Sequence, residues 1–401
     1  MTEKNNFKKA FQIGFVCIFT YVANYFLRNL LGVLTPEMTN SQSFTEGYLA
    51  LLASVYMVVY AAGQLVNGVL GDRIKPKYMV SCGLLIAALS LLLFYFQGQR
   101  EALGILAFGI LGFGLSMMRG PLVKVISENT APGHARICCV FLSFSGFAGP
   151  FLASFAAMLL DWHTAFLVAA IISLAMSAFV FFMLTLFEKK GMIVPIERKS
   201  AMTTGKKPGL LSLFRLPNFM VYMVVGMVVE IAAASIGFWM PNYFNKYLLF
   251  EESTSTLLFS MISLLRALCP FLSLLIFRLF RERDILIVRL AFSLSAILFI
   301  ILFFVQNPVV NVILFTLALM CSSISSATLW SIYIPSLGKT GNVSSANGVL
   351  DCTGYVAAAL VNLAIVPIMD FGGWGGVIIS WSATMMVGTL VTLFAHKNGN
   401  P

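Results

Sequence analysis

Long apolar runs alternate with short polar segments along the whole chain. Each run is long enough for a helix to cross a hydrocarbon core of about 30 Å, which takes roughly 20 residues. We expect twelve transmembrane helices, at residues 10–33, 47–70, 77–97, 102–126, 138–160, 164–187, 217–240, 254–279, 285–305, 308–336, 346–369 and 374–395. The pattern therefore predicts an all-α membrane protein.

A longer polar interval divides these helices into six and six. It predicts an N-terminal six-helix bundle (1–187), a cytoplasmic linker (188–216) and a C-terminal six-helix bundle (217–401). The halves show weak internal symmetry, since "GDRIKPK" follows the second helix and "FRLFRERD" follows the eighth. Two related halves of six helices are typical of secondary transporters, in which the halves rock around a central binding site.

The composition agrees with a membrane protein, because 59% of the residues are hydrophobic and only 10% are charged. The net charge of +10 could indicate a nucleic-acid partner, but its distribution argues against one. With both termini in the cytoplasm, 19 Lys and Arg residues fall in cytoplasmic segments and two fall in outer loops. Such a bias predicts a multi-pass protein of a cell (plasma or inner) membrane with cytoplasmic termini.

Residues that would support other functions are absent or scattered. The seven Cys fall in predicted helices without disulfide or metal-ligand spacing, and the three His lie far apart in loops or in the tail. No P-loop is present, so ATP is not the energy source. We therefore predict no enzyme activity, catalytic residue, cofactor or metal site, and we expect a monomer in the lipid bilayer. A sensor would be expected to carry a long added domain.

Several motifs resemble those of a known family. "GVLGDRIKPK" is similar to the loop signature of the major facilitator superfamily, with Gly68, Asp72, Arg73 and Lys77 at the expected places. "NYFLRNLL" (24–31), "FWMPNYF" and "DFGGWGG" look most like its organophosphate:phosphate antiporter branch. The resemblance implies the major facilitator fold and secondary transport.

The same branch implies two arginines, on the first and seventh helices, that clamp a phosphoryl group. Arg28 matches the first, whereas Ala233 stands at the second position and Glu230 is the nearest charge. Gln64 and Ser145 replace a lysine and a histidine of the branch, and we group Gln64 with the substrate-binding residues, as we do Tyr21, Asn24 and Tyr25. The resemblance therefore favours anion binding over phosphate exchange.

Arg28 lies well inside the first predicted helix, where an arginine is costly. Tyr21, Asn24 and Tyr25 share its face by their spacing of three and four residues. A guanidinium there can form bidentate hydrogen bonds to a carboxylate or phosphate. We interpret Arg28 as an anion anchor; the alternative is an internal ion pair with Glu230 or Asp351.

Each charged residue considered in the C-terminal half has two alternative interpretations. Arg266 either supplies a second substrate cation or pairs permanently with Glu230. Glu230 itself either couples transport to protons or balances the charge of Arg28 or Arg266. Asp351 shares a helix face with Tyr355, which we group with the substrate-binding residues. Asp351 is either a second coupling or gating acid or a polar cap near the cytoplasmic mouth.

Further charges lie toward the predicted cytoplasmic side. Asp72 can pair with a helix end or a basic residue and so hold the halves in one state; alternatively Asp72 and Arg73 only set the topology. We favour a gating or structural role for Arg119 over substrate contact. Lys124 lies near a helix end, where its side chain can reach the interface.

Together these features predict a secondary active transporter of a small organic anion, such as a phosphorylated or carboxylated metabolite, with protons or phosphate as the coupling ion. A drug/proton antiporter is an alternative, since "SGFAGPFLAS" partly resembles that class, and an organophosphate/phosphate exchanger is another. A membrane-embedded enzyme and a sensor fit the sequence less well.

Overall fold

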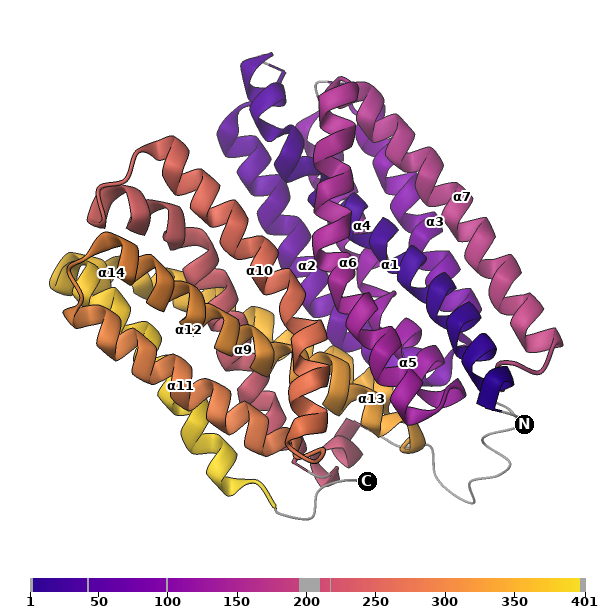
Figure 1. Ribbon diagram of the computed structural model, residues 1–401. Coiled ribbons are helices and arrows are strands. Elements are labelled where there is room, and N and C mark those ends of the chain that lie inside the picture. Colours follow the sequence, from indigo (N-terminus) through magenta and orange to yellow (C-terminus); the bar gives the residue numbers. More distant parts are fainter. Residues whose placement is uncertain (1–2, 42, 99, 195–209, 217, 397–401) are drawn as a thin grey trace. The chain divides into compact units, whose positions relative to one another are not determined.

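The computed structural model describes residues 3–41, 43–98, 100–194, 210–216 and 218–396 (Figure 1). Within these ranges the chain forms helices and no strand. Eleven helical segments of the described residues are long and apolar enough to cross a membrane. The predicted all-α membrane class is confirmed.

The chain divides into two compact units, the first formed by Met1–Leu213 with Ile334–Val349 and the second by Phe214–Tyr333 with Leu350–Pro401. Residues 195–209 of the predicted linker (188–216) lie outside the described residues. The helices of the first unit before this gap are α1 (Glu3–Asn40), α2 (Glu46–Arg73), α3 (Pro76–Tyr95), α4 (Glu101–Ser116), α5 (Arg119–Asn129), α6 (Pro132–Leu159) and α7 (Trp162–Lys189).

The second unit follows a 3₁₀ turn, η1 (Leu210–Arg215). Its main helices are α9 (Phe219–Asn242), α10 (Glu252–Leu279), α11 (Asp284–Phe304), α12 (Pro308–Thr328) and most of α14 (Val343–Val391). Short elements complete it: the π-helical turns η2 (Tyr243–Tyr247) and η3 (Leu329–Tyr333), and the 3₁₀ turn η5 (Thr392–Phe394). Two further short elements, α13 (Ile334–Ser336) and η4 (Leu337–Lys339), belong to the first unit.

One predicted span differs in detail from the observed helices. The span predicted at 102–126 is divided between α4 and α5 at Met117 and Met118. The spans predicted at 346–369 and 374–395 correspond to two helices that share the label α14 and are separated by a kink at Gly373 (φ 55°, ψ −154°). Glycine tolerates this positive φ without steric cost, so the chain can leave the helical conformation there.

Local sequence signals fix several helix starts. Thr45 accepts a hydrogen bond from the Tyr48 amide (3.2 Å), and Asp161 accepts one from the Thr164 amide (3.0 Å). Such caps satisfy backbone donors that have no partner within the helix. The Thr164 amide also lowers the pKa of the exposed Asp161 carboxyl, because the hydrogen bond favours the ionised form.

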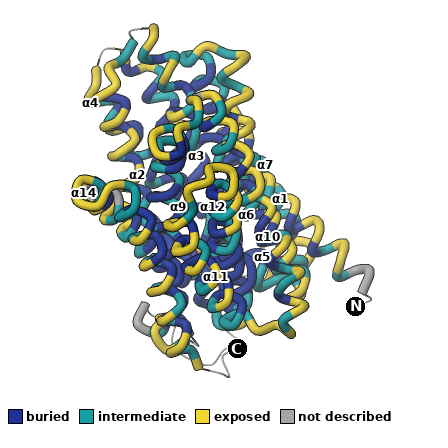
Figure 2. The backbone as a smooth tube through the Cα atoms, turned by 60° about the vertical axis from the view of Figure 1, so that its left-hand side comes forward, coloured by how far each residue is buried: buried dark blue, intermediate teal, exposed yellow. Residues whose placement is uncertain are grey.

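Small polar residues join the helices of the first unit. Ser90 of α3 donates to the Ala107 carbonyl of α4 (2.8 Å), and Ser173 and Ser177 of α7 donate to carbonyls of α3 (2.8 and 2.7 Å). Close helix packing with hydroxyl–carbonyl bonds is typical of membrane bundles. Large apolar side chains remain exposed, including Phe11 and Phe15 of α1, as lipid contact requires. Figure 2 marks the exposed positions along the backbone in yellow.

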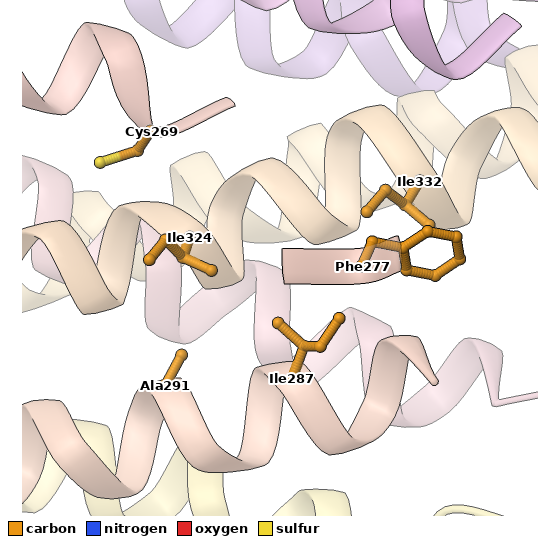
Figure 3. Packing of buried hydrophobic residues seen from close by; sticks show 6 residues of the cluster. All are labelled: Cys269, Phe277, Ile287, Ala291, Ile324 and Ile332. Carbon is orange, nitrogen blue, oxygen red and sulfur yellow. The ribbon is translucent and has the colours of Figure 1, made fainter. Parts of the chain in front are cut away.

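The second unit has its own apolar core. Figure 3 shows one cluster of it, which is formed by α10, α11, α12 and η3: Cys269, Phe277, Ile287, Ala291, Ile324 and Ile332. A buried hydrogen bond from the Trp381 indole to the Ser235 hydroxyl (2.8 Å) joins α14 to α9. This packing holds α9, α10 and α14 in place, and these helices carry Glu230, Arg266 and Asp351.

Candidate functional site

Arg28 of α1 lies against two tyrosine rings. Its guanidinium carbon is 4.9 Å from the ring centre of Tyr60 on α2 and 5.7 Å from that of Tyr25 on α1. Cation–π contacts of this kind contribute about 0.5–2 kcal/mol. The two rings, on α1 and α2, therefore help to orient the cation.

The aromatic surroundings extend along both helices. Tyr21 meets Tyr25 edge to face (5.1 Å between ring centres), and Tyr56 stacks on Tyr60 (5.7 Å). Tyr56, Tyr60 and Gln64 repeat every four residues and therefore share one face of α2. Gly112 of α4 packs behind this face, since a Cβ there would lie 2.6 Å from the Tyr56 carbonyl oxygen.

Tyr56 and Tyr60 are absent from the residues predicted from the sequence. Their spacing of four from Gln64 is a signal that could have identified them, but contact with Arg28 depends on how α1 and α2 pack. Asn24 and Gln64, which were predicted, are both buried, with 1% and 2% of their surface exposed. Tyr21 and Tyr25 lie where their spacing from Arg28 placed them.

Asp72 at the end of α2 has two kinds of partner in the first unit. Lys124 of α5 contacts its carboxylate (3.1 Å) and also donates to the carbonyls of Gly71 and Asp72. The same carboxylate accepts hydrogen bonds from the amides of Ser344 (3.1 Å) and Ser345 (2.8 Å), in the first turn of α14. A carboxylate at a helix N-terminus is stabilised by the helix dipole and by these amides.

The ion pair is buried, because the Asp72 and Lys124 side chains are only 8% and 5% exposed. Removing one partner of such a pair is strongly destabilising. Arg73 is exposed and forms no ion pair with any residue that the structure describes. Arg119 is half-buried at the start of α5 and acts electrostatically on the Cys139 thiol of α6.

Glu230 of α9 and Arg266 of α10 lie within range of electrostatic interaction in the second unit. The Glu230 carboxylate acts electrostatically on the Arg266 guanidinium, which also donates to the Ser323 hydroxyl of α12 (3.2 Å). Gly354 of α14 packs on Glu230, since a Cβ there would lie 2.6 Å from the glutamate Cγ. The structure thus brings α9, α10 and α14 together around one carboxylate.

Asp351 and Tyr355 lie on α14 on either side of Gly354, the residue that packs on Glu230. Asp351 is 2% exposed and lies one turn before Gly354, whereas Tyr355 is half-buried. Among the described residues, no three His, Cys, Asp or Glu side chains are grouped so that they could hold a metal ion.

Comparison with known proteins identifies the family. The model of the Major Facilitator Superfamily matches residues 17–362. The chain is 24% identical over 158 residues to "Membrane sensor protein UhpC" of Salmonella typhimurium (38% of this chain, 36% of that protein). It is 28% identical over 102 residues to "Probable hexose phosphate transport protein" of Chlamydia muridarum (25% of this chain, 22% of that protein). These matches span about a third or less of each relative.

The fold is also that of a solved transporter. The FucP transporter in its outward conformation superposes with a TM-score of 0.73 at 14% identity, over 96% of this chain and 99% of that one. At this identity the likeness shows the fold alone. The family match settles the class: the chain belongs to the Major Facilitator Superfamily, and its apolar helices are those of a multi-pass membrane protein.

Proposed function

We propose that the protein transports a small organic anion across a cell membrane by alternating access and that protons drive the transport. The observation that carries this proposal is the position of Arg28 between the rings of Tyr25 and Tyr60. An arginine within a membrane span is costly, so its retention suggests a function. Its planar fork matches a carboxylate or phosphate better than any other side chain does.

The relatives favour a phosphorylated or carboxylated metabolite as the substrate. Two partial relatives are named "Probable hexose phosphate transport protein". The chain departs from the organophosphate branch at Ala233, which stands where that branch carries its second arginine. We propose that Arg266 supplies the second cation in the C-terminal half and that phosphate is not the exchanged ion.

Glu230 is the residue that we propose for proton coupling. While ionised, it attracts Arg266 and competes with an anionic substrate for that cation. Protonation removes the competition, so binding of the anion and of a proton favour each other. Asp351 on α14 is the other acid near this contact and is the second candidate.

For Asp72 we propose a gating role. It holds the first turn of α14, in residues 334–349, against α2 and α5 through two amides and Lys124. Release of these contacts would free that segment to move during the transport cycle. Both termini are placed in the cytoplasm in this proposal, as the distribution of Lys and Arg predicts.

Uptake into proteoliposomes tests the proposal. We expect purified protein to concentrate a labelled sugar phosphate or sugar acid when the outside is acidified, and to do so without phosphate inside. Accumulation that requires internal phosphate would support the exchanger instead. Export of a cationic dye would support the drug antiporter, and substrate binding without uptake would support a sensor, as the name of one relative suggests.

A further inference from the structure

Three polar atoms near Arg28 are buried without a hydrogen bond to any residue that the structure describes: the Asn24 Oδ1, the Tyr56 hydroxyl and the Gln64 Nε2. Their residues are 1%, 5% and 2% exposed. Burying a polar atom without a partner costs free energy, and most such atoms in native proteins are satisfied. Three of them in one region therefore call for an explanation.

The three groups belong to α1 and α2, the two helices whose tyrosines contact the cation. Asn24 lies one turn before Arg28 on α1, while Tyr56 and Gln64 lie one turn on either side of Tyr60, whose ring contacts Arg28. Arg28 also acts electrostatically on the Tyr56 hydroxyl. A ligand bound to the guanidinium would thus meet an amide of α1 and a hydroxyl and an amide of α2.

Another tyrosine of α2 differs because its partners are in the protein. Tyr48, also 5% exposed, donates its hydroxyl hydrogen bond to the Gln97 Oε1 (3.0 Å) and the Glu101 carbonyl (3.1 Å). The Tyr48 hydroxyl therefore joins helices, whereas Tyr56 and Gln64 offer hydrogen-bonding atoms that no described residue uses.

The chemistry of the three atoms indicates what they bind. An amide oxygen only accepts, an amide NH₂ only donates, and a phenol does both. A simple carboxylate can satisfy the donors but not the Asn24 Oδ1. Hydroxyl groups satisfy all three. We propose that Asn24, Tyr56 and Gln64 determine specificity by binding hydroxyl groups of the transported anion, an inference that rests on the proposed anion site at Arg28.

Matched pairs of anions test this specificity. The thermal unfolding midpoint of the purified full-length protein is measured against tartrate and succinate, and against glycerol 3-phosphate and propyl phosphate. The members of each pair differ only in hydroxyl groups. We expect the wild-type protein to bind the hydroxylated member of at least one pair about tenfold or more tightly, since several hydrogen bonds are lost together in the other member.

The variants Tyr56→Phe, Gln64→Met and Asn24→Leu should each reduce that preference by about three- to tenfold. Affinity for the member without hydroxyls should stay unchanged. Tyr48→Phe is the control, because it removes a buried hydroxyl of the same helix that is already satisfied. It should lower the unfolding midpoint of the ligand-free protein and leave the preference intact, whereas Tyr56→Phe should not lower that midpoint.

The outcomes separate this inference from the proposed function. If Arg28→Lys weakens anion binding while Tyr56→Phe, Gln64→Met and Asn24→Leu leave the preference unchanged, the anion site stands and the specificity role is wrong. An absence of any preference in the wild-type protein also overturns it. If none of the four anions shifts the midpoint of the wild-type protein, the proposed function and this inference both fail.

Discussion

The two units hold their membrane cations in different ways. Arg28 of the first unit lies against the rings of Tyr25 and Tyr60. Arg266 of the second unit lies close to the Glu230 carboxylate and donates to Ser323. A ring face attracts a cation at every pH, whereas a carboxylate attracts it only while ionised. The first arrangement thus keeps a constant field, and the second can be switched by one proton.

The difference suggests a division of function, in which the first unit anchors the anion and the second unit couples its transport to protons. A constant cation suits an anchor that must hold the anion whatever the proton gradient. A cation whose partner titrates suits the step that links the anion to the proton. The predictions below test this division, from the largest expected effect to the smallest.

Replacement of Glu230 should have the largest effect. Glu230→Gln removes the switch and keeps the shape, so proton-driven accumulation should be abolished. Downhill exchange of the anion should remain within about threefold of the wild-type rate, because Arg28 still anchors it. Proteoliposome uptake with and without a pH gradient measures both. Asp284→Asn is the control, because it changes an acid of the same unit that accepts a hydrogen bond from the Tyr222 hydroxyl. This variant should accumulate the anion at the wild-type level.

If Glu230→Gln still concentrates the anion along a proton gradient, coupling does not reside at this residue. Asp351 is buried one turn before Gly354, which packs on Glu230, and it would then be tested by the same measurement. Loss of exchange together with accumulation would mean that Glu230 acts in binding, and the division between the units would be wrong.

Arg28→Lys should retain the positive charge but lose the planar guanidinium, which can donate two parallel hydrogen bonds. A charge-assisted hydrogen bond contributes about 1.5–3 kcal/mol, so the loss of one predicts a fall of roughly 10- to 100-fold in transport efficiency. Initial uptake rates measure this fall. Arg289→Lys is a matched control, since Arg289 donates to the Thr392 carbonyl and hydroxyl within the second unit. Equal activity of both variants would contradict the anchor.

The sequence predicted the helices well and their contacts only in part. Apolar runs gave the spans because a lipid-crossing helix must be apolar along its whole length. The polar face of Arg28 with Tyr21 and Tyr25 also followed, since it depends on the spacing within one helix. Contact with Tyr60 depends on how two helices pack, and spacing within each helix carries no such information.

Lys124 also shows that contacts between helices do not follow from the position of a residue within its own helix. Its position near a helix end suggested a side chain that reaches the interface, yet it is buried against Asp72 of a different helix. Depth along a helix can be read from the sequence, whereas the neighbour at that depth cannot. The break at Gly373, by contrast, followed from the sequence, because it lies between the spans predicted at 346–369 and 374–395.

Replacement of Asp72 tests whether a charged residue outside the binding site affects the transport cycle. Asp72→Ala leaves Lys124 buried without its carboxylate, a change that costs about 3–5 kcal/mol for a buried pair. We expect a lower unfolding midpoint and faster labelling of Ser345→Cys, placed in a background without native cysteines. Ser345 is 7% exposed, so labelling reports release of the first turn of α14.

Glu188→Ala is the control for this measurement. Its ion pair with Lys77 (2.6 Å) joins α7 to α3 and does not involve α14. This variant should lower the midpoint less, because the pair is more exposed, and should leave the labelling rate unchanged. Equal labelling in Asp72→Ala and the wild-type background would show that Asp72 does not hold the segment.

The smallest expected effect concerns the ring that contacts Arg28. Tyr60→Phe keeps the ring face and should change anion affinity by less than about twofold, while Tyr60→Leu removes the cation–π contact. That contact contributes about 0.5–2 kcal/mol, so affinity should fall by roughly 2- to 30-fold in Tyr60→Leu. Ligand-induced shifts of the unfolding midpoint, measured at two pH values, give both numbers. The loss should be the same at each pH, because the ring's attraction for a guanidinium does not titrate. A loss that grew as the pH rose would tie Tyr60 to a titrating group, and the constant field assigned to the first unit would then be wrong.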